Sequence, residues 1–326
     1  MAATADRRRF TSARPFPHLV IDDFLSLPFA RALTAEFPPY DSARFRDPFG
    51  REGKASYRRF AALGPAFRRL DALTLGRSFR RRLEALSGIR GLLHDRDRYR
   101  GGAHEYLNGM GLPPHLDFNA LGPGWNRRLN VMIFLTPGWR PGWGGEVVLG
   151  SRARGQTEKA IAPLFNRCLL FAVDDRSWYR VRPPAAPRRT PAATRKSASL
   201  YYYAAEPPER ASAPRLTLWD FPGLPRRAEA GARLDESLWR ELETPLMLRD
   251  RELLPDAPLG GGRLPSPLSA RLVRGASLTR RDVDWLSNEF ARRDRALKRR
   301  WHYSERFLDE AVSRLRSGRR RYRRAP

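Results

Sequence analysis

Short apolar runs separated by turn residues fill the middle of the chain, and they predict β-strands. Runs of strand length, rich in Val, Ile, Leu, Phe and Tyr, cover Arg128–Leu135, Glu146–Leu149, Asn166–Val173, Trp178–Arg182 and Ser197–Ala204. The intervening segments, loaded with Gly, Pro, Ser or Arg, are Pro137–Trp143, Ser151–Thr157 and Pro183–Pro191. Many short strands joined by such turns predict a sandwich or jelly roll.

Helical spacing appears on the N-terminal side of these strands. After a start over residues 1–15 that we expect to be mobile, Phe16–Asp22 reads as a strand. Ser26 can then cap a helix that has a proline in its first turn and runs toward Glu36. Apolar residues within Ala66–Leu86 recur mostly on one side, so this region is expected to cover an outer face of the sheet.

The last third of the chain lacks the pattern of short strands and is instead Pro- and Gly-rich, then helical. Residues 206–277 are rich in Pro and Gly and are expected to form a connecting region, with a short helix over Leu234–Leu242. From Thr279, with Asp282 three residues on as a capping partner, a long basic amphipathic helix is predicted within residues 278–326. Its apolar stripe consists of Leu286, Phe290, Leu297, Trp301, Leu308, Val312 and Leu315. Such a stripe indicates packing, against the same domain or against another chain.

The composition suits a folded protein with one large or two modest cores, since the chain has 326 residues and 41% hydrophobic content. The formal charge of +27 raises nucleic-acid binding as a hypothesis. However, the positive residues are almost all Arg and are spread along the whole chain, so we expect no nucleic-acid partner. The one concentrated basic run, residues 318–326, is expected to be a solvated, disordered tail.

The single cysteine, Cys168, excludes an internal disulfide, and its apolar surroundings predict a small buried side chain. The basic N-terminus is not followed by an apolar core, and no apolar run approaches the 18 or so residues of a membrane span. We therefore expect neither a secretory signal nor a membrane span, and a cytoplasmic location.

His115 and Asp117 form a His-x-Asp pair in a segment that reads as a strand. Residues i and i+2 of a strand point to the same face, so the imidazole and the carboxylate can close on one metal ion. A mononuclear iron(II) oxygenase needs two histidines and one carboxylate on one face of the metal. Alone, the pair is weak evidence, because such residues are more often hydrogen-bonded structural groups.

The surrounding motifs make the pair more specific. Five segments occur in the right order: RYRGGAHEYLNGMGLPPHLDFN, RRLNVMIFLTPGW, WGGEVVL, IAPLFNRCLLFAVDDRSW and RKSASLYYY. Together with FPHLVIDDFLSLPFARALTAEFP near the N-terminus, they resemble the prolyl 4-hydroxylase-like branch of the 2-oxoglutarate and iron(II)-dependent dioxygenases. The resemblance covers roughly the first 205 residues. It implies a dioxygenase domain over residues 16–205 that is mainly β with flanking helices, with a double-stranded β-helix (cupin-like jelly roll) as its core and a helical C-terminal extension.

The resemblance also implies where the co-substrate binds. Arg195 and Ser197 match the Arg-x-Ser pair that anchors 2-oxoglutarate, and an Arg fork pairs well with a carboxylate. Tyr106, expected to open the strand before His115, matches a tyrosine aimed at the same molecule. Asn130 and Trp143 match family positions as well, but core packing explains them equally. The implied cofactors are iron(II), 2-oxoglutarate and O2, and ascorbate is left open.

The distal histidine of the family is missing. The family has Ser-Trp-His-Gly, whereas this chain has Ser177, Trp178, Tyr179 and Arg180, with no histidine between His115 and His302. Three alternatives follow: a Tyr179 phenolate as third metal ligand, a two-ligand site completed by water, or a pseudoenzyme. Arg180 in place of glycine favours the third, because its side chain is expected beside the metal.

The sequence therefore predicts a dioxygenase that hydroxylates a C–H bond and decarboxylates 2-oxoglutarate to succinate. Its substrate is open between a prolyl or other protein side chain and a small molecule. The alternative is a catalytically impaired pseudo-oxygenase that serves as a binding scaffold, because Tyr179 replaces the distal histidine.

Overall fold

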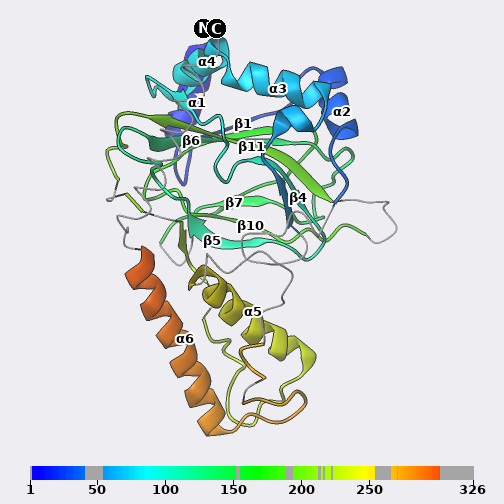
Figure 1. Cartoon of the computed structure of the whole chain (residues 1–326), viewed down its shortest axis with the longest axis vertical. Helices are drawn as coiled ribbons and strands as arrows, with labels where there is room; N and C mark the ends of the chain where they lie inside the picture. Colours follow the sequence, from blue (N-terminus) through cyan, green and yellow to red (C-terminus); the bar gives the residue numbers. More distant parts are fainter. Residues whose placement is uncertain are drawn as a thin grey trace. The chain divides into compact units, whose positions relative to one another are not determined.

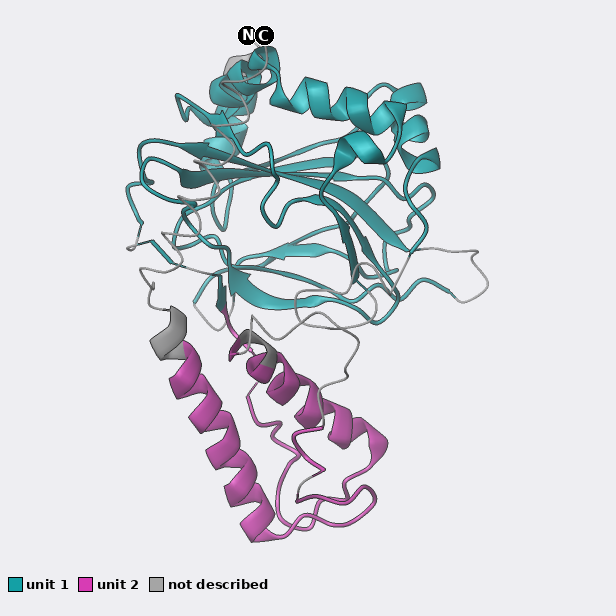
Figure 2. Ribbon diagram, in the orientation of Figure 1, with its two compact units in different colours: residues 1–45, 53–218, 303–326 teal, residues 46–52, 219–302 magenta. Residues whose placement is uncertain are grey.

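The computed structural model describes residues 2–40, 54–151, 155–187, 194–211, 214–215, 217–221, 223–253, 266–269 and 271–301. The chain divides into two compact units, one drawn from residues 1–45 and 53–218 and the other from residues 219–302 (Figure 2). The tail over residues 318–326 and the apolar positions Leu308, Val312 and Leu315 lie outside the described residues. None of the described helices is long and apolar enough to cross a membrane.

The first unit contains two β-sheets. The larger has the order β1-β9-β6-β11-β4-β2, with β3 added beside β11. Its strands are β1 (His18–Ile21), β2 (Lys54–Tyr57), β3 (Leu93–His94), β4 (Gly102–Tyr106), β6 (Asn126–Phe134), β9 (Cys168–Ala172) and β11 (Arg195–Ala204). The smaller has the order β12-β5-β10-β7-β8. Its strands are β5 (Leu112–Leu116), β7 (Val147–Leu149), β8 (Lys159–Ile161), β10 (Tyr179–Val181) and β12 (Leu218–Trp219). Neighbouring strands run antiparallel in every pair whose register is described, which confirms a mainly β fold.

Helices cover the outer face of the larger sheet (Figure 1). They are α1 (Ala2–Ser12), α2 (Leu27–Ala35), the 3-10 turn η1 (Phe60–Ala62), α3 (Pro65–Leu75) and α4 (Arg77–Ser87). Apolar residues of these helices and of alternate strand positions form one core cluster, including Leu33, Phe67, Leu129 and Leu200. The expected helical region over Ala66–Leu86 is thus present as two helices, because the chain turns at Gly76, whose ψ of 149° is extended.

The expected mobile start is corrected by α1. Residues 2–12 are helical, and Phe10 is only 2% exposed in the core cluster against the sheet. The burial of Phe10 helps to hold this short basic helix on the first unit.

The second unit corrects the expected connecting region. Helix α5 runs over Glu236–Leu253, well past the predicted Leu242, and contains Pro245. A proline inside a helix removes one hydrogen bond, yet Leu238, Trp239, Leu242 and Leu246 are buried in the unit's own core, and this burial offsets the cost. Helix α6 (Arg280–Trp301) follows, with reciprocal capping between Thr279 and Asp282 and with Leu286, Phe290 and Leu297 buried.

Candidate metal and co-substrate site

His115 is positioned by a proline bulge in β5. Tyr179 of β10 faces His115, and Val181 faces Leu112, so β5 has one residue more than β10 between the two pairs. Pro113 and Pro114 occupy this stretch, and prolines are tolerated at bulges because they cannot donate to the ladder. Nδ1 of His115 lies 2.9 Å from the Pro113 carbonyl oxygen, which can only accept, so Nδ1 carries the proton. Nε2 therefore presents its lone pair in the neutral ring, the form that ligates metals.

Asp117 follows directly after β5 and faces His115. Its Oδ1 lies 3.8 Å from Nε2 of His115, so one divalent ion at bond lengths of about 2.1 Å can contact both atoms. Its Oδ2 accepts hydrogen bonds from Asn130 Nδ2 at 2.8 Å and from the Tyr179 hydroxyl at 3.1 Å. Burial works to raise the pKa of Asp117, but the charge of Arg127 and these contacts hold it below its usual value. The carboxylate is therefore ionised, and its two oxygens have different partners.

Arg127 is a site residue that the sequence did not reveal. It is 1% exposed, and its Nη2 lies 3.0 Å from Oδ2 of Asp117, while its Nε donates to Asn130 Oδ1 at 2.9 Å. The guanidinium also lies over the rings of Tyr201, at 3.5 Å, and Phe118, at 4.5 Å. Asp117 thus has a fixed cationic partner supplied by the protein.

Tyr179 lies where the resemblance implies the distal histidine. It pairs across the strands with His115, with ring centroids 4.2 Å apart. Its hydroxyl donates to Asp117, and burial together with the charge of Asp117 raises its pKa well above the usual value of 10. Without a bound metal ion, Tyr179 is therefore a protonated phenol beside the pair. Within the part of the chain that the structure describes, no three His, Cys, Asp or Glu side chains cluster to hold a metal ion.

Arg180 does not lie beside the pair, contrary to the expectation. Consecutive strand residues point to opposite faces, and Arg180 forms a two-pronged ion pair with Glu158, with Nη2 at 3.0 Å from Oε2. The Arg180 side chain is therefore directed toward Glu158 and away from His115.

The predicted co-substrate residues share the inner face of the larger sheet. Arg195, Tyr106 and Lys54 face one another across β11, β4 and β2, and Ser197, His104 and Ser56 form the next row. Arg195 is 2% exposed, donates from Nε to the Gly145 carbonyl at 2.7 Å, and lies 3.3 Å from Ser197 Oγ. Tyr106 lies in β4, the strand before the one that carries His115, but it ends that strand rather than opening it.

Asn130 and Trp143, whose roles the sequence left open, have different surroundings. Asn130 is fully buried and joins Asp117 to Arg127 through hydrogen bonds, so it supports the site as well as the core. Trp143 packs edge-on against Trp139, with ring centroids 5.8 Å apart. Arg215 was not predicted, yet its Nη1 donates to the Asp117 carbonyl at 2.7 Å and its Nη2 pairs with Asp175 at 3.1 Å.

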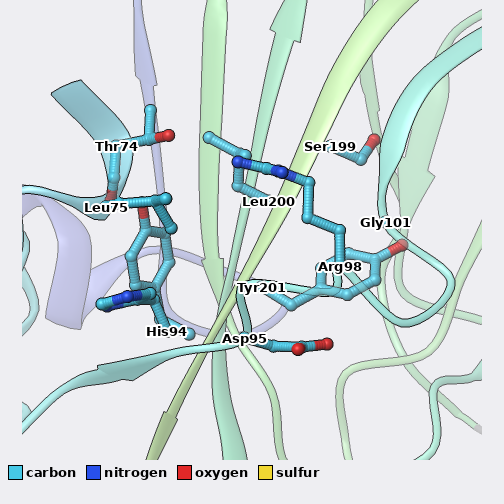
Figure 3. A pocket seen from close by; sticks show the side chains of 10 residues that line it. Thr74, Leu75, His94, Asp95, Arg98, Gly101, Ser199, Leu200 and Tyr201 are labelled. Carbon is cyan, nitrogen blue, oxygen red and sulfur yellow. The ribbon is translucent and has the colours of Figure 1, made fainter. Parts of the chain in front are cut away.

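A separate small hollow lies beside β11, lined by residues that include Thr74, His94, Asp95 and Arg98 (Figure 3). Burial, followed by the charges of Arg80 and Arg96, lowers the pKa of His94 to about 4. None of the predicted site residues lines this hollow.

Residues 101–203 match the family model of the 2OG-Fe(II) oxygenase superfamily, about a third of the chain. The match confirms the resemblance: the segment that carries His115, Asp117 and Arg195 is similar to the 2OG-Fe(II) oxygenases, a family that implies iron(II) and 2-oxoglutarate.

Solved structures similar to the chain include a prolyl hydroxylase from Trichoplax adhaerens in complex with a hypoxia inducible factor peptide fragment. It is 18% identical, with a TM-score of 0.44, over 62% of this chain and 89% of that chain. A prolyl 4-hydroxylase structure from Phytophthora capsici is 18% identical, with a TM-score of 0.44, over 96% and 87%. HygX from Streptomyces hygroscopicus, with nickel and 2-oxoglutarate bound, is 14% identical, with a TM-score of 0.42, over 57% and 82%. No curated protein matches the chain significantly.

Proposed function

We propose that the chain is a 2-oxoglutarate- and iron(II)-dependent dioxygenase built on a double-stranded β-helix. The observation that carries the proposal is the pairing of Nε2 of His115 with Oδ1 of Asp117 at 3.8 Å. A neutral imidazole and an ionised carboxylate fit two positions of an iron(II) site, and the remaining positions would be filled by water or co-substrate.

The residues of the chain would hold and orient the reactants. His115 and Asp117 would bind iron(II), and Arg195 with Ser197 would anchor the distal carboxylate of 2-oxoglutarate. Tyr106, whose ring centroid lies 5.0 Å from the Arg195 guanidinium, would pack beside the same molecule. The chemistry that bound iron(II) and O2 supply is hydroxylation of a C–H bond coupled to decarboxylation of 2-oxoglutarate to succinate, with ascorbate as a candidate reductant. The substrate would be a prolyl or other protein side chain, or a small molecule.

The test is whether the purified protein consumes 2-oxoglutarate when iron(II) is added in air. We expect succinate to form, measured by proton NMR, and to be lost in His115→Ala and in excess EDTA. The exposed Lys159, on β8, offers Lys159→Met as a control that keeps the wild-type rate. Absence of succinate from well-folded, iron-supplied protein would contradict the proposal.

A pseudo-oxygenase that serves as a binding scaffold is the second candidate. It is favoured by the hydrogen bond from Tyr179 to Asp117 and by the ion pair of Asp117 with Arg127, since both engage the carboxylate without a metal. This candidate would bind 2-oxoglutarate but produce no succinate in the same assay.

A further inference from the structure

The negative charge of Asp117 is already balanced by the chain itself. Arg127 lies 3.0 Å from Oδ2, and both side chains are buried. Buried charges are tolerated when they are paired and hydrogen-bonded, and here Asn130 and Tyr179 complete the pairing. The site therefore does not depend on a metal ion to neutralise Asp117, its one proposed acidic ligand.

Arg195, in contrast to Asp117, has no ion-pair partner among the described residues. It is almost completely buried, and its described hydrogen bonds go to a neutral carbonyl and a neutral hydroxyl. Among the residues that the structure describes, no carboxylate forms an ion pair with it. The charge of Glu146 acts on this guanidinium without forming an ion pair with it, so direct contact with a carboxylate is left for an anionic ligand to supply.

Lys54 provides a second cation on the same row. It faces Tyr106 across β2 and β4, and its Nζ lies 5.3 Å from the ring centroid, while Arg195 Cζ lies 5.0 Å from that centroid. The two cationic groups are therefore at most about 10 Å apart. Burial, then the charges of Lys54 and Arg195, keep the pKa of His104 well below its usual value, so the histidine beside both cations is neutral.

We propose that this row binds a short dicarboxylate without a metal ion, with one carboxylate at Arg195 and the other at Lys54. The inference rests on the proposed function for the identity of the ligand, 2-oxoglutarate. A five-carbon dicarboxylate spans about 5 Å between its carboxylate carbons. Each charge-assisted hydrogen bond adds roughly 3 Å, so such a molecule can engage both cations at once.

Metal-free binding should differ from metal-dependent binding in the ligands that it selects. The 2-oxo group distinguishes 2-oxoglutarate when a metal chelates it, but two cations recognise only the two carboxylates. Without metal, glutarate should therefore bind nearly as well as 2-oxoglutarate, while the monoacid pentanoate should bind much more weakly.

The experiment is titration calorimetry of full-length protein in EDTA, with 2-oxoglutarate, glutarate and pentanoate as ligands. We expect glutarate to match 2-oxoglutarate within about threefold and pentanoate to bind at least about tenfold more weakly, the scale of one charge-assisted hydrogen bond. Lys54→Met keeps the length of the side chain and should weaken both diacids by about tenfold or more. Lys159→Met, an exposed lysine on β8, should leave all three affinities unchanged.

The outcomes separate this proposal from the oxygenase proposal. Binding of 2-oxoglutarate to cobalt(II)-loaded protein but not to protein in EDTA would overturn metal-free binding and leave the oxygenase intact. Diacid binding in EDTA without succinate formation in the iron assay would support metal-free binding and defeat the oxygenase. If Lys54→Met does not fold, the affinities of the wild-type protein for glutarate and pentanoate still test the proposal. Equal affinities for the two ligands would contradict a role for the second cation.

Discussion

The two faces of strand β11 are built from alternate residues of one segment but are held in different ways. On the outer face, Ala198, Leu200 and Tyr202 belong to the apolar core beneath the helices. On the inner face, Arg195 and Ser197 are buried and contact each other, and Tyr201 packs against the Arg127 guanidinium. Stability on the outer face comes from non-directional burial. On the inner face each buried charge or polar group needs its own partner, so the loss of one partner should cost more than its size suggests.

The sharpest test of this difference is to remove a charge from the inner face. Arg127→Met should lower the free energy of unfolding by about 3 to 5 kcal/mol, because Asp117 would be left buried without its cation. Urea denaturation measures this change. The adjacent Arg128, which donates to the Glu206 carbonyl, supplies the control: Arg128→Met should cost less than about 1 kcal/mol. A loss no larger in Arg127→Met than in Arg128→Met would show that the ion pair does not support the fold.

The outer face should respond to lost volume and not to charge. Leu200→Ala should lower the free energy of unfolding by about 2 to 4 kcal/mol through a cavity in the core, while leaving 2-oxoglutarate affinity unchanged. Denaturation and calorimetry on the same preparation separate the two effects. A Leu200→Ala protein that loses ligand affinity at constant fold would mean that the two faces are coupled.

Arg195 should matter for ligand binding. Arg195→Ala should weaken 2-oxoglutarate binding by about 1.5 to 3 kcal/mol, the usual scale for a charge-assisted hydrogen bond. Calorimetry with iron(II) under anaerobic conditions gives the affinity, with Lys159→Met as the unaffected control. Unchanged affinity in Arg195→Ala would remove this residue from the site.

Variants of Tyr179 test the position of the missing histidine, and their expected effect on stability is smaller. As a protonated donor, it should give no visible phenolate-to-iron(III) band, and Tyr179→Phe should cost about 1 kcal/mol of stability for one hydrogen bond. Tyr179→His should strengthen iron(II) binding, since Arg180 is turned away and held by Glu158. A charge-transfer band that disappears in Tyr179→Phe would restore the phenolate alternative.

A further effect depends on pH and concerns His94, which pairs with Tyr202 between β3 and β11. The pKa of His94 is lowered from 6.5 to about 4, so between these values the unfolded chain binds a proton that the folded protein does not. The free energy of unfolding should therefore fall as the pH drops from about 6.5 to 4. His94→Asn should flatten this part of the profile, measured by urea denaturation at several pH values. An unchanged slope would show that the pKa of His94 is the same in the folded and unfolded states.

Sequence reasoning found the residues whose spacing carries information. The i, i+2 spacing of His115 and Asp117 and the Arg-x-Ser pair of Arg195 and Ser197 both place side chains on one strand face, and the structure brings each pair together. Arg127 was not predicted as a site residue, and the reason is physical. The register of β6 with β11 shifts by one residue between Leu129 and Arg127, so a bulge turns Arg127 inward where alternation from Asn130 would have selected Arg128.

Other differences arise from tertiary context. Lys54 and Arg215 are single basic residues in an Arg-rich chain, and no local pattern distinguishes them from exposed ones. The length of α5 was underestimated because Pro245 normally ends a helix, whereas the leucines around it are buried in the core of the second unit. These features depend on packing between segments that are distant in the sequence, so no single segment predicts them.

The proline bulge in β5 also bears on how such a site can change during evolution. Pro113 and Pro114 lack amide hydrogens, so the strand cannot slide along β10 and exchange one hydrogen-bonded register for another. The direction in which His115 points is therefore inherited with the backbone and does not have to be selected through metal binding. The residue across from it, Tyr179, can therefore be exchanged while the backbone that directs His115 stays in place.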